Sequence, residues 1–234
     1  MDGIEKSIDY CSPIDDDFQD PNWDSVQQIN VKPSFVLIEG NEKICSFNIS
    51  NLVVTQKLFE KVMGMNPSLN LNDNLPVERV SWYEAITFCN KLSSLKKLSC
   101  CYDINGTNIK INVSANGYRL PSKKEWIFAA VGGNQKNDFI YAGSNKISDV
   151  AWFNVNSACK VQIPGQKNPN SVGLYDMSGN IWEWTNDSID SQIIVCGGAV
   201  NSSSSDCEIL NQGQKTFRPE TKNETIGFRL VKKA

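Results

Sequence analysis

Two capping boxes constrain the fold of this chain most strongly, because each one sets the first turn of a helix. Residues 81–84 read Ser-Trp-Tyr-Glu and residues 122–125 read Ser-Lys-Lys-Glu, so serine and glutamate can bond each other's backbone N–H groups. Apolar residues follow both boxes at helical spacing, and a shorter helix is predicted between Thr55 and Gly64. Beyond Gly133 no convincing helical pattern appears. The sequence therefore predicts its two main helices early.

Strand patterns surround these helices. Residues 35–37 and 47–49 alternate around a Gly-Asn turn, which predicts a hairpin, and residues 108–113 alternate after Asn105-Gly106. The best strands of the second half are 193–196 and 226–231, both rich in β-branched residues. We therefore predict an α+β domain, with two main helices followed by a loop-rich antiparallel sheet.

Composition limits the chemistry that this domain can perform. The chain of 234 residues contains no histidine, which excludes Ser-His-Asp and Cys-His triads and histidine-ligated metals. Its net charge is −3 and its lysines are scattered, so we expect no nucleic-acid partner. No apolar run approaches the roughly 20 residues of a membrane helix, so we expect no membrane insertion by this segment. We predict an acidic N-terminal arm at residues 1–30 and one domain at residues 31–234.

The eight cysteines follow no recognisable metal or disulfide spacing. They form no CxxC pair, and the adjacent Cys100 and Cys101 are poorly placed to bond each other. Buried cysteine commonly behaves as a small apolar residue. We expect most of these thiols to be reduced.

Four segments resemble one known family. They are PVERVSWYEAITFCNKLS at 76–93, YRLPSKKEWIFAA at 118–130, NSVGLYDMSGNIWEW at 170–184 and IGFRL at 226–230. In order and spacing they are similar to the formylglycine-generating-enzyme, or sulfatase-modifying-factor, domain over nearly the whole chain. The resemblance implies a C-type lectin fold in its enlarged, helix-containing form. It does not by itself imply the activity.

The resemblance also identifies a disrupted catalytic pair. Formylglycine-generating members use two cysteines, five positions apart, to bind copper and oxidise a substrate cysteine. The first position corresponds to Cys207, but the second is Gln212. An amide cannot replace the second soft thiolate of a Cu(I) site, so we expect no copper and no catalytic residues. A copper- or thiol-dependent oxidase using Cys207 in a new way remains the alternative.

A structural calcium site is a further implication of the resemblance. The family's ligands correspond to the side chains of Asp176 and Glu183 and the backbone carbonyls of Gly179 and Ile181. Hard oxygen donors of this kind suit Ca²⁺. The alternative is that Asp176, Asn180 and Glu183 only satisfy buried backbone donors. The sequence leaves both interpretations open.

Residues 185–225 depart furthest from the family. They resemble the diversified segment in the variable proteins of diversity-generating retroelements, including treponemal members of that class, although a polar loop of this composition can also be an ordinary solvated one. On this resemblance we predict a non-catalytic ligand-binding protein with a variable protein or other macromolecular ligand. The third interpretation is a purely structural surface protein. The predicted contacts are Asn201, Ser203, Ser205, Asp206, Glu208, Ile209, Leu210, Asn211, Gln212 and Phe217.

The expected location is the bacterial cell surface. This expectation comes from the family resemblance and not from any segment of the sequence. A lipid anchor on a removed N-terminal leader is one route to that location.

Overall fold

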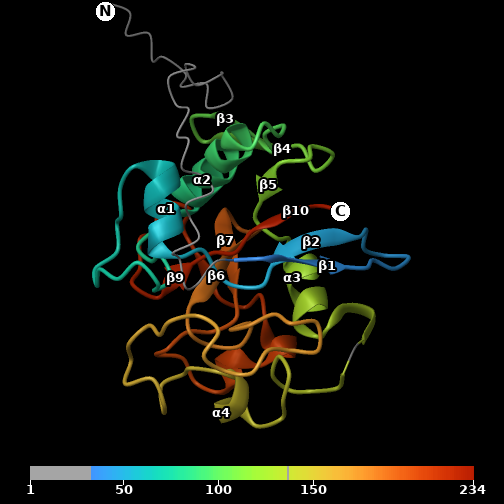
Figure 1. Cartoon of the computed structure of the whole chain (residues 1–234), viewed down its shortest axis with the longest axis vertical. Helices are drawn as coiled ribbons and strands as arrows, with labels where there is room; N and C mark the ends of the chain where they lie inside the picture. Colours follow the sequence, from blue (N-terminus) through green and yellow to red (C-terminus); the bar gives the residue numbers. More distant parts are fainter. Residues whose placement is uncertain (1–32, 136) are drawn as a thin grey trace, which may run out of the picture.

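The structure is a computed structural model that describes residues 33–135 and 137–234. The predicted acidic arm at residues 1–30 therefore lies outside the described residues. Figure 1 shows two helices side by side at one end of the domain and long loops at the other, with strands between them.

All three predicted helix starts are confirmed. The Thr55 hydroxyl accepts a hydrogen bond from the Leu58 N–H, and complete capping boxes form at Ser81 and Ser122. One further helical turn, α4, lies beyond Gly133, where none was predicted. It has no side-chain cap, so no local signal marked it. The helices are α1 (Gln56–Met63), α2 (Trp82–Leu95), α3 (Lys123–Ala130) and α4 (Ile147–Val150).

The first sheet joins the two ends of the described chain. The predicted hairpin of β1 and β2 forms its edge, and β10 pairs antiparallel with both β2 and β5. The strand predicted at residues 108–113 is β4, and it pairs with β3 in a separate two-stranded sheet. The strands are β1 (Phe35–Ile38), β2 (Phe47–Ser50), β5 (Tyr118–Arg119), β10 (Val231–Lys233), β3 (Tyr102–Asn105) and β4 (Asn108–Ile111).

The second four-stranded sheet carries the late part of the chain, in the order β8-β7-β6-β9. Its strand β9 runs parallel to β6, so the sheet is mixed and not wholly antiparallel as predicted. The single strand predicted at residues 226–231 is divided between two sheets, β9 here and β10 in the first. The strands are β6 (Trp182–Ile189), β7 (Gln192–Cys196), β8 (Thr216–Phe217) and β9 (Ile226–Gly227).

The C-terminal residues between β9 and β10 pack at the centre of the core. The Phe228 ring lies edge-on to Phe88 and to Phe59, with ring centroids 5.2 Å and 6.3 Å away. These contacts join α1, α2 and the link between the sheets. A second apolar cluster surrounds Trp126 of α3 and includes Ile209 of the loop after β7. The late loops are thus anchored in the core.

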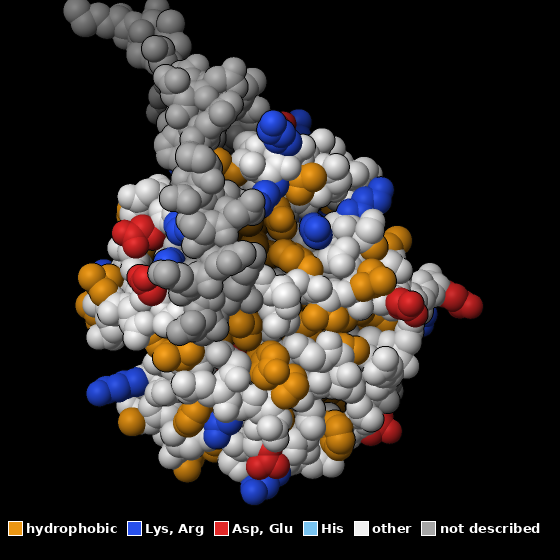
Figure 2. All heavy atoms as spheres, viewed as in Figure 1, with side chains coloured by type: hydrophobic (Ala, Val, Ile, Leu, Met, Phe, Trp, Pro, Cys, Tyr) orange, Lys and Arg blue, Asp and Glu red, His pale blue; other side chains and the backbone are white. Residues whose placement is uncertain are grey.

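The surface shows no concentration of basic charge on the face drawn in Figure 2. Lys and Arg side chains lie there singly, with acidic and apolar side chains between them. No helix among residues 33–135 and 137–234 is both long and apolar enough to cross a membrane.

Candidate functional site

A buried ion pair supports the second four-stranded sheet, which contains part of residues 185–225, the segment that departs furthest from the family. Strand β6 places Glu183 opposite Cys196 of β7, and the link between β9 and β10 brings Arg229 against it. Arg229 Nε donates to Glu183 Oε2 at 2.6 Å, and Nη2 donates to Oε1 at 2.6 Å. Trp126 Nε1 also donates to Oε2, at 2.7 Å. Both charged side chains are fully buried, so the pair is satisfied internally.

The two carboxylates among the implied calcium donors are engaged largely in internal contacts. Both oxygens of Glu183 accept bonds from a guanidinium, whose positive charge opposes a nearby cation. Asp176 Oδ2 accepts the Gly165 N–H at 2.8 Å, which leaves only the buried Oδ1 without a partner. The contacts favour the alternative of internal hydrogen bonding.

Asp176 occupies an electrostatically unfavourable position within this core. Its side chain is 2 % exposed, and burial raises its pKa to about 6. The amide of nearby Asn180 exchanges bonds with the backbone of Gln162 in both directions. Both residues have positive φ, 55° and 64°, a conformation that Asp and Asn tolerate better than most residues.

Cys207 is a core residue and not a reactive thiol. It has no exposed surface and packs in an apolar cluster with Tyr141, Val150 and Phe153. Burial raises the pKa of its thiol to about 12, so almost none is thiolate at neutral pH. Gly198, at φ 80°, lies directly beside it, since a Cβ there would be 2.6 Å from the sulfur.

Gln212, at the position of the family's second cysteine, fastens the loop. Its Oε1 accepts the Gly197 N–H at 2.7 Å. Its Nε2 donates to the carbonyls of Asp206 and Glu208, at 3.0 and 2.6 Å. The side chain is only 5 % exposed. One amide therefore ties the end of the β7 strand to two consecutive turns of the segment, η3 (Ser205–Cys207) and η4 (Ile209–Asn211).

The structure divides the ten predicted contact residues into three groups. Ile209 is 1 % exposed and Gln212 is similarly buried, so their inclusion is corrected: both hold the loop and neither faces solvent. Phe217 is half-buried against Trp184, with ring centroids 6.3 Å apart. Of the other seven, Ser203 and Glu208 are half-buried and the rest are exposed. Together they form what we call the segment surface: Asn201, Ser203, Ser205, Asp206, Glu208, Leu210 and Asn211.

A cleft of about 230 Å³ opens beside the segment surface. Asp206 and Asn211 form part of its wall, and Trp182 of β6 contributes an aromatic side chain. Trp182 belongs to the family motif at residues 170–184, and nothing in that motif indicated that it would line a cleft. Gly213, Gln214 and Lys215, which also line the cleft, lie inside the predicted variable segment but were not singled out.

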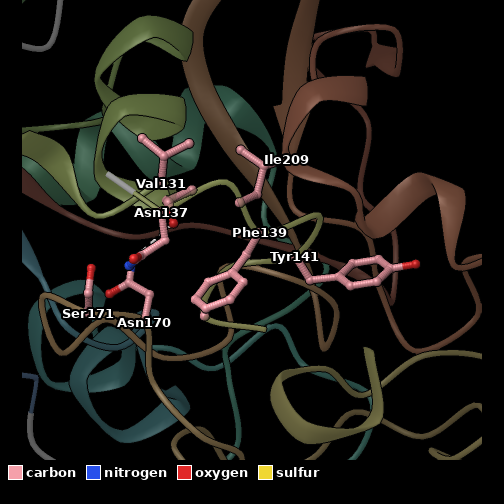
Figure 3. A pocket seen from close by; sticks show the side chains of 9 residues that line it. Val131, Asn137, Phe139, Tyr141, Asn170, Ser171 and Ile209 are labelled. Carbon is pink, nitrogen blue, oxygen red and sulfur yellow. Dashed lines mark hydrogen bonds between the residues drawn. The ribbon is translucent and has the colours of Figure 1, made fainter. Parts of the chain in front are cut away.

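The loop before α4 is a second neighbour that the sequence did not indicate. The Ile209 N–H donates to the Ile140 carbonyl at 3.0 Å, which fixes residues 137–141 beside the segment. Figure 3 shows Phe139 and Ile209 at the same small cavity, while the Tyr141 side chain extends away from it. No periodic pattern could have paired these residues, because both stretches are irregular.

Comparison with known proteins confirms the family resemblance. The sulfatase-modifying factor enzyme 1-like domain family matches residues 38–234. Chaperone protein LppX of Paenibacillus barcinonensis is 37% identical over 199 residues, which cover 66% of this chain and 71% of that protein. The inactive C-alpha-formylglycine-generating enzyme 2 of Bos taurus is 25% identical over 202 residues, 77% of this chain and 58% of the relative.

Solved structures agree with this assignment. Treponema denticola variable protein 1 superposes with a TM-score of 0.73 at 27% identity, over 87% of this chain and 94% of that one. CarF gives a TM-score of 0.76 at 25% identity, over 87% and 99% of the two chains. The similarities to a variable protein and to an inactive enzyme are consistent with a non-catalytic binding role. The chain belongs to the sulfatase-modifying factor enzyme 1-like domain family and has its C-type lectin-like fold.

Proposed function

We propose that this protein is a non-catalytic binding protein whose segment surface contacts a macromolecular ligand, with a protein as the favoured class. One observation carries the proposal: exposed polar side chains of residues 201–211 project from a backbone that buried neighbours hold in place. A rigid scaffold with adaptable polar side chains on its loops suits recognition.

Several buried hydrogen bonds hold the backbone of the segment in place. Ser202 Oγ accepts the Ala199 N–H at 2.9 Å, and Ser178 Oγ donates to the Cys207 carbonyl at 2.8 Å. With Gln212, these bonds hold the loop without using the exposed side chains of Asn201 or Leu210. Asn201 and Leu210 can therefore change at little cost to folding. Ser203, Ser205, Asp206 and Asn211 also make side-chain hydrogen bonds within the loop.

The state of Cys207 and Gln212 argues against the alternative oxidase. A Cu(I) site needs accessible, soft thiolates. Here the first position is a buried thiol of raised pKa, and the second is an amide whose bonds are already made. The test is oxygen uptake with copper and a cysteine-containing peptide. Uptake that disappears in Cys207→Ser would establish the oxidase instead.

Exchange of side chains at the segment surface tests the binding role. We would replace Asn201, Ser203, Ser205, Asp206 and Asn211 together by the residues of a naturally differing variant. Peptides selected from a random display library against the parent should then lose affinity. Equal affinity for parent and chimera, with both correctly folded, would refute the proposal. A matched chimera altered at exposed residues of β4 serves as the control.

Diversification and location are tested separately. We expect the surrounding genomic DNA to contain a near-copy of the 3′ end of this gene beside a reverse transcriptase, differing at template adenines. Its absence would leave a binding protein of fixed specificity. For the proposed bacterial surface location, we expect an impermeant reagent to label the protein on intact cells as well as in lysed cells. Labelling in lysed cells alone would contradict that location.

A further inference from the structure

Leu210 is the most exposed of the large apolar side chains in the described part of the chain. It is 87% exposed, whereas the other exposed side chains of residues 201–211 are polar. Single exposed leucines are common on soluble proteins. Leu210 differs because of how its turn is held and because of what lies beside it.

The turn that carries Leu210 is held on both sides. Ile209, immediately before it, is buried in the cluster around Trp126. Gln212, two residues later, bonds the Glu208 carbonyl, and the Asn211 amide donates to Glu208 Oε2 at 2.8 Å. Leu210 is thus presented on a preformed turn, and little backbone order has to be gained when it is covered.

Two further exposed apolar residues lie on the neighbouring loop. Phe139 is 39% exposed and Ile140 is 49% exposed. The bond between the Ile209 N–H and the Ile140 carbonyl joins the two loops directly, and Phe139 and Ile209 meet at the cavity in Figure 3. We call Phe139, Ile140 and Leu210 the apolar patch. Two of its three members lie outside residues 185–225.

We propose that the apolar patch is an anchor that receives an apolar side chain of a protein ligand, while the polar segment surface sets which ligand binds. This inference rests on the proposed function and adds a fixed element to it. Apolar side chains gain from burial only where the partner also brings apolar surface. Residues 201–211 contain two charged side chains, Asp206 and Glu208, both acidic. They disfavour phosphate-bearing ligands and favour a ligand with a basic residue beside its apolar one.

Point substitutions on the full chain test the anchor. The probe is a set of synthetic peptides taken from a random display library selected against the parent protein. We would measure their Kd for Leu210→Asp and Ile140→Asp, with Val113→Asp as control. Val113 is 66% exposed and lies just beyond β4. Because all three side chains are exposed, circular dichroism and melting should match the parent.

We expect Leu210→Asp and Ile140→Asp each to lose about tenfold or more in affinity for the peptides, the size typical of an interface anchor. Val113→Asp should change Kd by less than about twofold. The selected peptides should also share an apolar residue next to a basic one. Unchanged affinity in both patch variants overturns the anchor. If the segment-surface chimera still loses binding in that case, the proposed function stands and only this inference fails.

Discussion

Restoring the missing cysteine should damage this protein and not revive an enzyme. In Gln212→Cys, the chain regains both cysteine positions of the family's catalytic pair. The short thiol cannot reach the Gly197 N–H or the carbonyls of Asp206 and Glu208, to which the Gln212 amide is bonded. The variant therefore tests whether position 212 is structural.

The expected cost follows from these three bonds. Each net hydrogen bond contributes about 0.5–1.5 kcal/mol, and a buried donor left without a partner costs about 1–3 kcal/mol. The Gly197 N–H is the buried donor here. We expect the free energy of unfolding to fall by about 2–4 kcal/mol. For a chain of this size that lowers Tm by roughly 2–4 °C per kcal/mol.

Denaturant unfolding measures the loss, and oxygen uptake with copper and a cysteine peptide measures activity. Gln214→Cys is the matched control, because Gln214 is exposed and lies only two residues further along the same loop. It should change stability by less than about 0.5 kcal/mol. A Gln212→Cys protein as stable as the control, or one that consumes oxygen, would show that this reasoning is wrong.

Three predictions concern the core below the segment. Glu183→Gln leaves Arg229 without its charge partner and should cost about 3–5 kcal/mol in chemical denaturation; a cost below about 1 kcal/mol would contradict the buried pair. Calcium or EDTA should leave Tm unchanged, whereas a rise with calcium would restore the calcium interpretation. Asp176 has a folded pKa of about 6, above its unfolded value, so the folded state binds the proton more tightly and stability falls as pH rises from about 4 to 6. In EDTA, Asp176→Asn should flatten this slope and stabilise the protein at pH 7 by up to about 3 kcal/mol; an unchanged slope would refute the assignment.

The sequence predicted those features that interactions between neighbouring residues determine. The helices after Ser81 and Ser122 were found because a capping box and the spacing of apolar residues both act within a few residues. The hairpin of β1 and β2 was found because its strands alternate around a turn, and strand β4 was found because its alternation follows Asn105-Gly106. The family resemblance added the overall fold, which no local pattern could provide.

The features that the sequence did not predict depend on contacts between residues that are distant in the chain. Arg229 and Glu183 are 46 positions apart, and only the folded chain shows that they form an ion pair. Ile209 and Gln212 stand in a polar stretch and were taken as surface residues. Their burial comes from Trp126 and Gly197, which no spacing rule relates to them. Similarly, the run at 226–231 has strand composition throughout, but its middle crosses between two sheets.

That crossing also affects the order in which the protein can fold. Strand β10 fills the place between β2 and β5, and β9 lies against β6. Until residues 226–233 have left the ribosome, β2 and β6 each present an open edge, and unpaired edges invite association with other chains. Residues 185–225 are synthesised just before this step, so under the proposed diversification each variant would reach a domain that is still open. We expect selection on the variants to include rapid closure as well as binding.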